Sequence, residues 1–429
     1  MSRPIPLTDL DRRLLAPGGP SPANHALVID FEPSRTPPFS LGELRRGAVA
    51  ACRAFPPAGA RLVRPERGPP VWEPAPGTPF PLVVRASSRS GDRAGSLRDF
   101  VVADFPLIGV PPVRQLLSGV GDPPAWTLVT QAHCALSDLP GLFLLVRRQL
   151  QAATASASTT RPQRGGPDLR RPRRQRVGRG ERESVRLRTS GGQASSRRMW
   201  GTLSFPRDLH DQRSPLVGYG WNDALVGAAV KALARWNRAA EAADQPFAVE
   251  VRESIRARPL DGFGNGTASR LARLPPREGL GRTMRSVCRA VALEAAGGEY
   301  LDVRRPRRSG LGAAAARLRS WRAAPTFAAA APITLMSPWP RWGGDPLPGR
   351  VRGLELVSSL SPDYPIGFVA MPLGERMLVT LTWDPAQLSK EDARKIAADF
   401  GRWVERTAPT GAVTRPHRAE PPPRHHLPA

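Results

Sequence analysis

The residues of this chain best suited to chemistry lie together near position 135. His133 is followed directly by Cys134 and, after three further residues, by Asp138. An imidazole can accept a proton near neutral pH, a thiolate can attack a carbonyl carbon, and a carboxylate can hold a loop in place. Adjacent residues on an extended segment point to opposite faces, which argues against a direct pair between Cys134 and His133.

A strand and a helix are expected on either side of these residues. The segment 126–131 has the β-branched and aromatic content of a strand. The segment 141–150 has the pattern of a helix, with Pro140 tolerated in the first turn and Asp138 well placed as its cap. The candidate residues are therefore expected on a strand–turn–helix connection.

This arrangement resembles the His-His-x-x-x-Asp-Gly site of the condensation-domain superfamily, which includes peptide-synthetase condensation domains and bacterial wax ester synthase/diacylglycerol acyltransferases. In that alignment His133 takes the first His, Cys134 the second, Asp138 the Asp and Leu139 the Gly. The second His is the catalytic base of the family, and this chain has a cysteine there. The resemblance implies that Asp138 is chiefly structural. Leu139 would reshape the loop if its position needs a positive φ, and Gly141 could restore the space.

Further segments resemble the superfamily in the same order along the chain. A helix at 221–236 begins with Asn222 and Asp223, which we interpret as a helix cap rather than as substrate ligands. Asn265 follows Gly264 in a stretch that resembles a Gly-Asn element, although it could be only a turn. The other matching segments are an opening segment at 4–14, a strand at 376–384 and a helix from Ser389.

The resemblance implies an α/β fold of two chloramphenicol-acetyltransferase-like lobes. They would form a V, with an interlobe tunnel that reaches the motif from both faces. Composition indicates an N-terminal lobe at 1–150, a disordered Arg-rich crossover at 151–199, a C-terminal lobe at 200–407 and a disordered tail at 408–429.

Three functions remain open for a site with a cysteine at the second position. In the first, His133 or substrate positioning suffices to join an acyl thioester to an amine or alcohol. In the second, Cys134 is a nucleophile paired with His133. In the third, the site is inactive and the chain docks a carrier protein or a tailoring enzyme. The first implies a substrate thioester of CoA or phosphopantetheine, an acyl or peptidyl carrier protein as partner, no resident cofactor or metal, and a role in bacterial natural-product or lipid biosynthesis.

The chain is strongly basic, with a formal net charge of +26. Residues 161–198 hold thirteen arginines against three acidic residues. Because nearly all cations are arginine, amid much Ala, Gly and Pro, we favour coding bias over selection for a polyanion, and no interleaved aromatics support nucleic-acid binding. We also expect a basic patch outside this segment, around one tunnel entrance, to steer an acidic carrier or the phosphates of CoA.

Compartment signals agree with one another. The first residues lack the pattern of a signal peptide, and no segment is long and apolar enough for a membrane span. The three cysteines are odd in number and widely spaced, which fits reduced thiols. The sequence therefore predicts a cytoplasmic protein.

Overall fold

The chain folds into two compact units. The computed structural model describes residues 4–7, 24–66, 70–74, 79–87, 91–103, 109–154, 173–175, 187–195, 197–206, 220–238, 247–254, 267–274, 287–288, 291, 299–301, 330–336, 351–360 and 364–406. The first unit comprises Met1–Arg170, Ser254–Thr267 and Pro340–Ser359. The second comprises Arg171–Glu253, Ala268–Trp339 and Leu360–Ala429.

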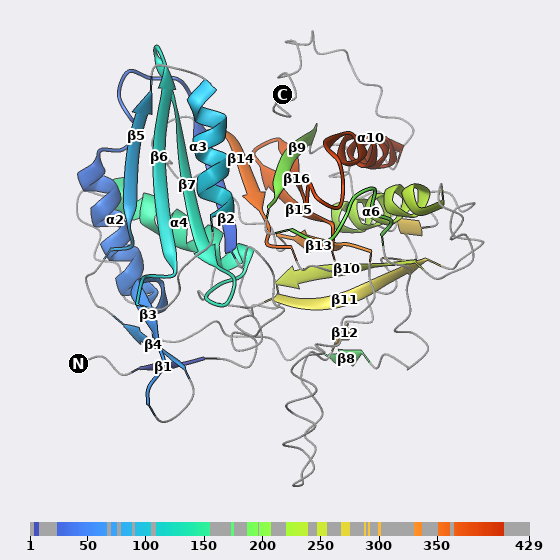
Figure 1. Ribbon diagram of the computed structural model, residues 1–429, viewed down its shortest axis with the longest axis horizontal. Helices are drawn as coiled ribbons and strands as arrows, with labels where there is room; N and C mark the ends of the chain where they lie inside the picture. Colours follow the sequence, from blue (N-terminus) through green and yellow to red (C-terminus); the bar gives the residue numbers. More distant parts are fainter. Residues whose placement is uncertain are drawn as a thin grey trace. The chain divides into compact units, whose positions relative to one another are not determined.

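The first unit is built on a mixed five-stranded sheet with the strand order β14-β2-β7-β6-β5 (Figure 1). The strands β14, β2, β7 and β6 pair antiparallel, whereas β5 and β6 are parallel. A separate three-stranded sheet has the order β1-β4-β3. The strands span β1 Ile5–Pro6, β2 Asn24–Phe31, β3 Ala60–Val63, β4 Val71–Pro74, β5 Leu82–Ser87, β6 Val113–Gly121, β7 Pro124–His133 and β14 Val351–Val357.

Helices cover both faces of the five-stranded sheet. They are α2 (Leu41–Ala54), α3 (Gly91–Val102) and α4 (Leu139–Thr154). On β6 the side chain of Arg114 bonds to the backbone carbonyl of Ala103 at the end of α3, while the next residue, Gln115, bonds to Gln149 on α4. Because successive strand residues point to opposite faces, α3 and α4 lie on opposite sides of the sheet.

Helix α2 packs directly against α4. Ser40 and Glu43 form the capping box that their spacing predicts, with hydrogen bonds of 3.2 and 2.7 Å between each side chain and the other residue's backbone N–H. One turn later, a β-carbon at Gly47 would overlap with the backbone carbonyl oxygen of Gln149. The glycine therefore lets the two helix backbones approach closely.

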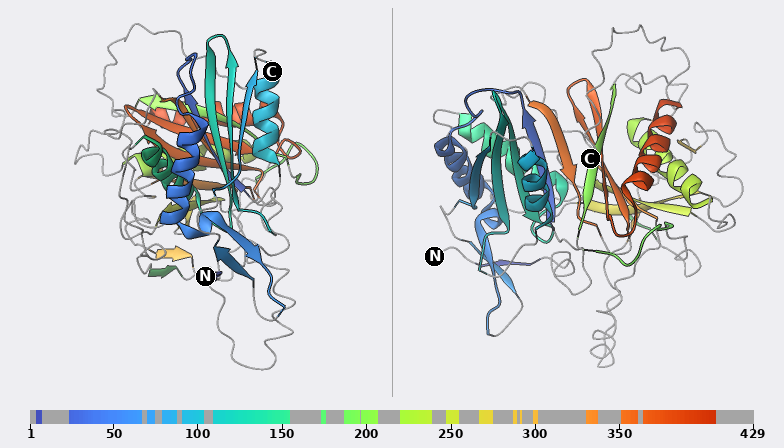
Figure 2. Two further views of the ribbon diagram at one scale, coloured as in Figure 1. Left: turned by 90° about the vertical axis from the view of Figure 1, so that its left-hand side faces the viewer. Right: turned by 45° about the horizontal axis from the view of Figure 1, so that its top comes forward.

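The second unit is built on a six-stranded sheet with the order β11-β10-β13-β15-β16-β9, and β8 pairs with β12 separately (Figure 2). Its helices are α6 (Trp221–Arg238) and α10 (Lys390–Arg406). The strands span β8 Arg173–Gln175, β9 Met199–Pro206, β10 Phe247–Ser254, β11 Thr267–Leu274, β12 Glu299–Leu301, β13 Pro332–Leu335, β15 Ile366–Leu373 and β16 Arg376–Trp383.

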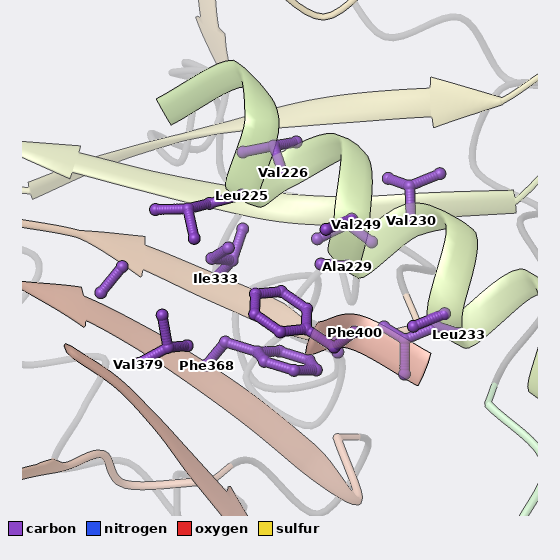
Figure 3. Close-up of a cluster of buried hydrophobic side chains, with 14 of the residues drawn as sticks. Leu225, Val226, Ala229, Val230, Leu233, Val249, Ile333, Phe368, Val379 and Phe400 are labelled. Atoms are coloured by element: carbon purple, nitrogen blue, oxygen red, sulfur yellow. The ribbon is translucent and has the colours of Figure 1, made fainter. Parts of the chain in front are cut away.

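The core of the second unit lies between helices α6 and α10 and the sheet (Figure 3). The rings of Phe368 on β15 and Phe400 on α10 stack with centroids 5.2 Å apart. On α10 the periodicity of the sequence predicts the buried face, and the structure buries four residues of it: Ala393, Ile396, Phe400 and Val404.

The predicted α/β fold is confirmed, and the predicted strands and helices around the motif form with ends shifted by a few residues. The predicted cap of α6 forms in part, with Asp223 taking part in it but with the N-cap two residues earlier than Asn222. Gly220 is the N-cap, because its carbonyl accepts from Ala224 N–H, and Asp223 accepts from Gly220 N–H. The V arrangement and the interlobe tunnel stay predictions.

Two segments from the C-terminal half are grouped with the first unit. For the segment Pro340–Ser359 the reason is visible in the sheet, because β14 pairs antiparallel with β2 over the register Leu354–Ile29 to Val357–Ala26. Most of the predicted crossover and the whole predicted tail lie outside the described residues. Within the part of the chain that is described, no helix has both the length and the hydropathy needed to span a bilayer.

Candidate functional site

The candidate residues lie where β7 passes into α4, as the sequence predicts. His133 is the last residue of β7 and pairs in register with Asn24 on β2. Cys134 begins the turn at 134–136, and α4 starts at Leu139. The carbonyl of His133 accepts hydrogen bonds from the backbone N–H groups of Leu136 and Ser137, which close the turn. The structure therefore brings the motif together on one strand–turn–helix connection.

The imidazole of His133 is buried and held by the backbone. His133 is 4% exposed, and its Nδ1 accepts a 3.1 Å hydrogen bond from the backbone N–H of Ala135. Since neutral imidazole carries one hydrogen, Nε2 then bears it. Burial lowers the pKa of His133 to about 4, so the ring is neutral at physiological pH. With Nδ1 accepting from Ala135 N–H and Nε2 carrying the hydrogen, the ring offers no free lone pair to a substrate in this arrangement.

The thiol of Cys134 is also buried, with 2% exposure of the residue. None of the three cysteines forms a disulfide bond. Burial raises the pKa of Cys52 to about 11 and that of Cys288 to about 12, as expected for thiols in apolar surroundings. The burial of Cys134 fits a small packing residue at this position.

Asp138 caps helix α4 and has both carboxylate oxygens engaged. Oδ1 accepts a 2.8 Å hydrogen bond from Gly141 N–H at the third helical position, and the backbone carbonyl accepts from Leu142 N–H. Oδ2 accepts a 2.6 Å hydrogen bond from the hydroxyl of Thr267. Asp138 thus links the start of α4 to a residue 129 positions later in the chain.

Leu139 and Gly141 lie in the first turn of α4. Leu139 takes the first helical position with 2% exposure, so its side chain contributes to the core. A helical backbone suits leucine, and the strand–turn–helix connection forms with this residue in place of the glycine. Gly141 supplies the backbone N–H that Asp138 binds.

Asn222 and Asp223 belong to the second unit, in the first turn of α6. Burial raises the pKa of Asp223, although the Gly220 N–H and the guanidinium of Arg270 act in the opposite direction. Arg270 forms an ion pair of 3.1 Å with Glu253. These contacts stabilise the N-terminal turn of α6 and its packing on the sheet. Asn265 lies outside the described residues.

Sequence reasoning missed Thr267 as a partner of Asp138. It lies two residues after Asn265, next to a stretch that drew attention for its resemblance, but a lone threonine carries no local signal of a distant contact. Among the residues that the structure describes, no group of three or more His, Cys, Asp or Glu side chains could hold a metal ion. The expectation that the protein needs no resident cofactor is not tested by this and stays a prediction.

Comparisons with known proteins find solved structures with a similar fold but no protein with a similar sequence. No protein-family model matches the chain, and no curated protein matches it. Among solved structures, the first condensation domain of the CDA synthetase is 15% identical and matches with a TM-score of 0.67, covering 95% of this chain and 97% of that one.

Two further structures match over similar lengths. The EpoB NRPS cyclization-docking bidomain from Sorangium cellulosum is 13% identical with a TM-score of 0.64, covering 94% of this chain and 85% of that one. The epimerization domain from the third module of tyrocidine synthetase B is also 13% identical, with a TM-score of 0.59 and coverage of 94% and 96%. The likeness therefore extends over nearly the whole chain.

Proposed function

Because this chain has the fold of condensation domains, we propose that it joins an acyl thioester to an amine. The acyl group is carried by CoA or by the phosphopantetheine of a carrier protein. The protein contributes by holding the two reactants together, which can itself supply several kcal/mol of the barrier. The retained strand–turn–helix motif, with His133 and Asp138 in supporting roles, is the part of the fold on which this site is built.

The observation that carries the proposal is the hydrogen bond from Ala135 N–H to Nδ1 of His133. It engages the imidazole at the first position, while the second position holds a thiol in place of the family's base. An alcohol needs a base to become a good nucleophile, whereas an α-amine with a pKa near about 8 is partly neutral at physiological pH and attacks unaided. The acceptor is therefore an amine rather than an alcohol.

The reaction balances without a protein base. The amine nitrogen attacks the thioester carbonyl carbon, and a C–N bond forms as the C–S bond breaks. The nitrogen loses one proton and the departing thiolate gains one, so the products are an amide and a free thiol. A thiolate whose acid titrates near about 8.5 is a competent final proton acceptor.

The comparisons support the choice of reactants. A double mutant of the starter condensation domain of rhizomide synthetase, which is 12% identical with a TM-score of 0.64, was solved in complex with C8-CoA and Leu-SNAC. An acyl-CoA and an aminoacyl thioester are thus bound by one protein of this fold. A reducing cytoplasm, where acyl thioesters are made, suits three buried cysteines without a disulfide.

The test offers the purified full chain a fixed donor and two acceptors. Octanoyl-CoA is incubated with leucyl-N-acetylcysteamine thioester or with 1-octanol, and product is followed by mass spectrometry. We expect the amide and no ester. Ester formation at a comparable rate, lost in His133→Ala but not accompanied by unfolding, would show that His133 acts as a base and overturn the proposal.

A non-catalytic docking module is the second candidate, favoured by the burial of both His133 and Cys134. In this case the chain binds a carrier protein or a tailoring enzyme without turnover. Binding would then survive His133→Asn, and neither amide nor ester would form with any thioester donor offered. Turnover of the amine acceptor excludes this candidate.

A further inference from the structure

Strand β5 forms one edge of the five-stranded sheet. It is the last strand in the order β14-β2-β7-β6-β5, and among the described strands it pairs with β6 alone (Figure 1). We propose that this edge pairs with β5 of a second copy of the chain, so that the two five-stranded sheets join across a two-fold axis. No residue of the candidate site lies on β5, and the pairing does not depend on the proposed function.

The apolar side chains of β5 are exposed on both faces of the sheet. Val83 is 43% exposed and Val84 is 44% exposed. Because they are adjacent on a strand, the two side chains point to opposite faces. In the part of the chain that the structure describes, these two valines and Leu41 are the exposed large apolar residues. The helices on either face thus leave the edge partly uncovered, and a strand added along it would cover both valines.

The backbone groups of β5 point alternately to β6 and to the edge of the sheet. The carbonyl of Pro81 accepts a 2.8 Å hydrogen bond from Gln115 N–H, and Leu82 is the register partner of Gln115 in the parallel pair. This pattern directs the backbone groups of the odd-numbered residues of β5 toward β6. The N–H and C=O groups of Leu82 and Val84 therefore point away from β6, where no described strand pairs with them.

An antiparallel copy of β5 matches these groups in an apolar register. A two-fold axis at Val83 sets Leu82 of each copy opposite Val84 of the other, and the two pairs exchange hydrogen bonds. Val83 then faces Val83 of the second copy as a non-hydrogen-bonded pair, with Cα atoms about 4.5 Å apart. Arg85 lies opposite Pro81, so the two guanidinium groups do not face each other. An axis at Val84 would instead set Arg85 opposite Val83 and give fewer apolar pairs.

The opposite edge of the same sheet has features that oppose strand addition. Strand β14 carries Arg352 and Glu355, and its register with β2 shifts before Gly353. Charged side chains and bulges are common means by which edge strands avoid association. The pairing of β5 with β6 has no such shift, and residues 82–84 are uncharged. The two edges of one sheet thus differ, and β5 is the one suited to accept a strand.

The proposed interface is small, and both copies are strongly basic. One short strand pair buries less than about 1,200 Å², so we expect a reversible dimer with a Kd between about 1 μM and 1 mM. The formal net charge of +26 on each chain opposes association. Because salt screens this repulsion, the dimer should become stronger as the ionic strength rises. A basic surface that binds an acidic partner would show the opposite dependence on salt.

The first experiment traps the dimer in the proposed register. The full chain carrying Val83→Cys is oxidised under mild conditions, and the covalent dimer is measured by non-reducing gel electrophoresis. The three cysteines already present are buried and should not cross-link. Since the two Val83 side chains face each other, we expect Val83→Cys to cross-link at least about tenfold faster than Leu41→Cys, an exposed control on α2. Val84→Cys faces Leu82 of the second copy and should cross-link no faster than the control.

The second experiment needs no added cysteine. Sedimentation equilibrium of the wild-type chain should show monomer and dimer in exchange. Val83→Lys places a charge at the centre of the edge and should weaken the dimer at least about tenfold. Leu41→Lys adds the same charge at an exposed apolar residue away from the edge, and it should change the Kd by less than about twofold. Far-ultraviolet circular dichroism confirms that each variant is folded.

Three outcomes would overturn the proposal. If a folded Val83→Cys variant cross-links no faster than Leu41→Cys, the two β5 strands do not meet. Faster cross-linking of Val84→Cys than of Val83→Cys excludes the proposed two-fold register. Equal weakening of the dimer by Val83→Lys and Leu41→Lys means that added charge alone, and not strand pairing, controls association.

Discussion

The hydroxyl of Thr267 donates a 2.6 Å hydrogen bond to Oδ2 of Asp138. The other carboxylate oxygen of Asp138 accepts from Gly141 N–H, so each oxygen has a fixed donor. A carboxylate bound in this way holds the first turn of α4 and the turn that carries Cys134. Asp138 is consequently a structural member of the motif, which agrees with the role that the family resemblance implies.

Replacing Thr267 by valine tests this relationship. The substitution keeps the shape of the side chain but removes the donor, which leaves Oδ2 of the largely buried Asp138 without this partner. We expect the free energy of unfolding to fall by about 1–3 kcal/mol, as measured by urea denaturation. Thr267→Ser keeps the hydroxyl and should lose less than half as much. A loss in Thr267→Ser at least as large as that in Thr267→Val would show that the methyl group contributes as much as the hydrogen bond, and would contradict the prediction.

The burial of His133 predicts a dependence of stability on pH, because burial disfavours the charged imidazolium. The folded pKa of about 4 lies below the ordinary value of 6.5, so between these values the unfolded state binds more protons. His133 therefore contributes full stability above pH 6.5, and this contribution is lost as the pH falls toward 4. Its size is roughly 3 kcal/mol, measured as the change in the free energy of unfolding across that range.

His133→Asn is the matched control for that prediction. Asparagine offers an oxygen near the position of Nδ1, so it can still accept from Ala135 N–H, but it does not titrate. The free energy of unfolding of His133→Asn should be close to that of the wild type at neutral pH. Below pH 6.5 the wild type should lose stability relative to this variant. His133→Ala, which removes the acceptor, should be less stable than His133→Asn at every pH. An unchanged difference between wild type and His133→Asn from pH 7 to 4 would contradict the assignment of a buried neutral imidazole.

Gly47→Ala should strongly destabilise the first unit. Alanine is the better helix former by about 1 kcal/mol, so helix propensity alone predicts a gain. The added β-carbon, however, would overlap with the backbone carbonyl of Gln149, and backbone cannot move aside as a flexible side chain can. We expect a net loss of about 2 kcal/mol or more in thermal or urea denaturation. Gly42→Ala on the exposed side of the same helix is the control and should be neutral or stabilising.

The parts of this fold that the sequence predicts are those with local signals. The capping box joins Ser40 and Glu43, which are three residues apart. The cap of α4 joins Asp138 and Gly141, which have the same separation. Hydrophobic periodicity on α10 likewise places its buried face correctly. In each case the interacting groups lie within about one helical turn, where spacing determines geometry.

The remaining parts depend on contacts between distant segments. Pairing of β14 with β2 brings residues more than 300 positions apart into register. Neither strand carries a local sequence signal that identifies the other as its partner. The bond between Thr267 and Asp138 is of the same kind. The state of His133 is different again, because it depends on which backbone N–H the turn directs at Nδ1, and that is a matter of geometry within three residues.

Cys134 gives the sharpest test of the site. Its thiol stands where the resemblance implies a catalytic imidazole, and it is buried with 2% exposure. Cys134→Ala removes a small packing group, so we expect turnover of the amine acceptor to change less than about twofold and stability to fall by about 1 kcal/mol. Cys134→His adds a ring at the base position and should raise turnover about tenfold or more, because a positioned general base contributes roughly 10²–10⁴-fold in rate. The larger side chain should also cost about 1–3 kcal/mol of stability, so the free energy of unfolding is measured beside the rate. A large loss of turnover in a folded Cys134→Ala variant would instead show that the thiol takes part in the reaction, and positioning alone would no longer explain the activity.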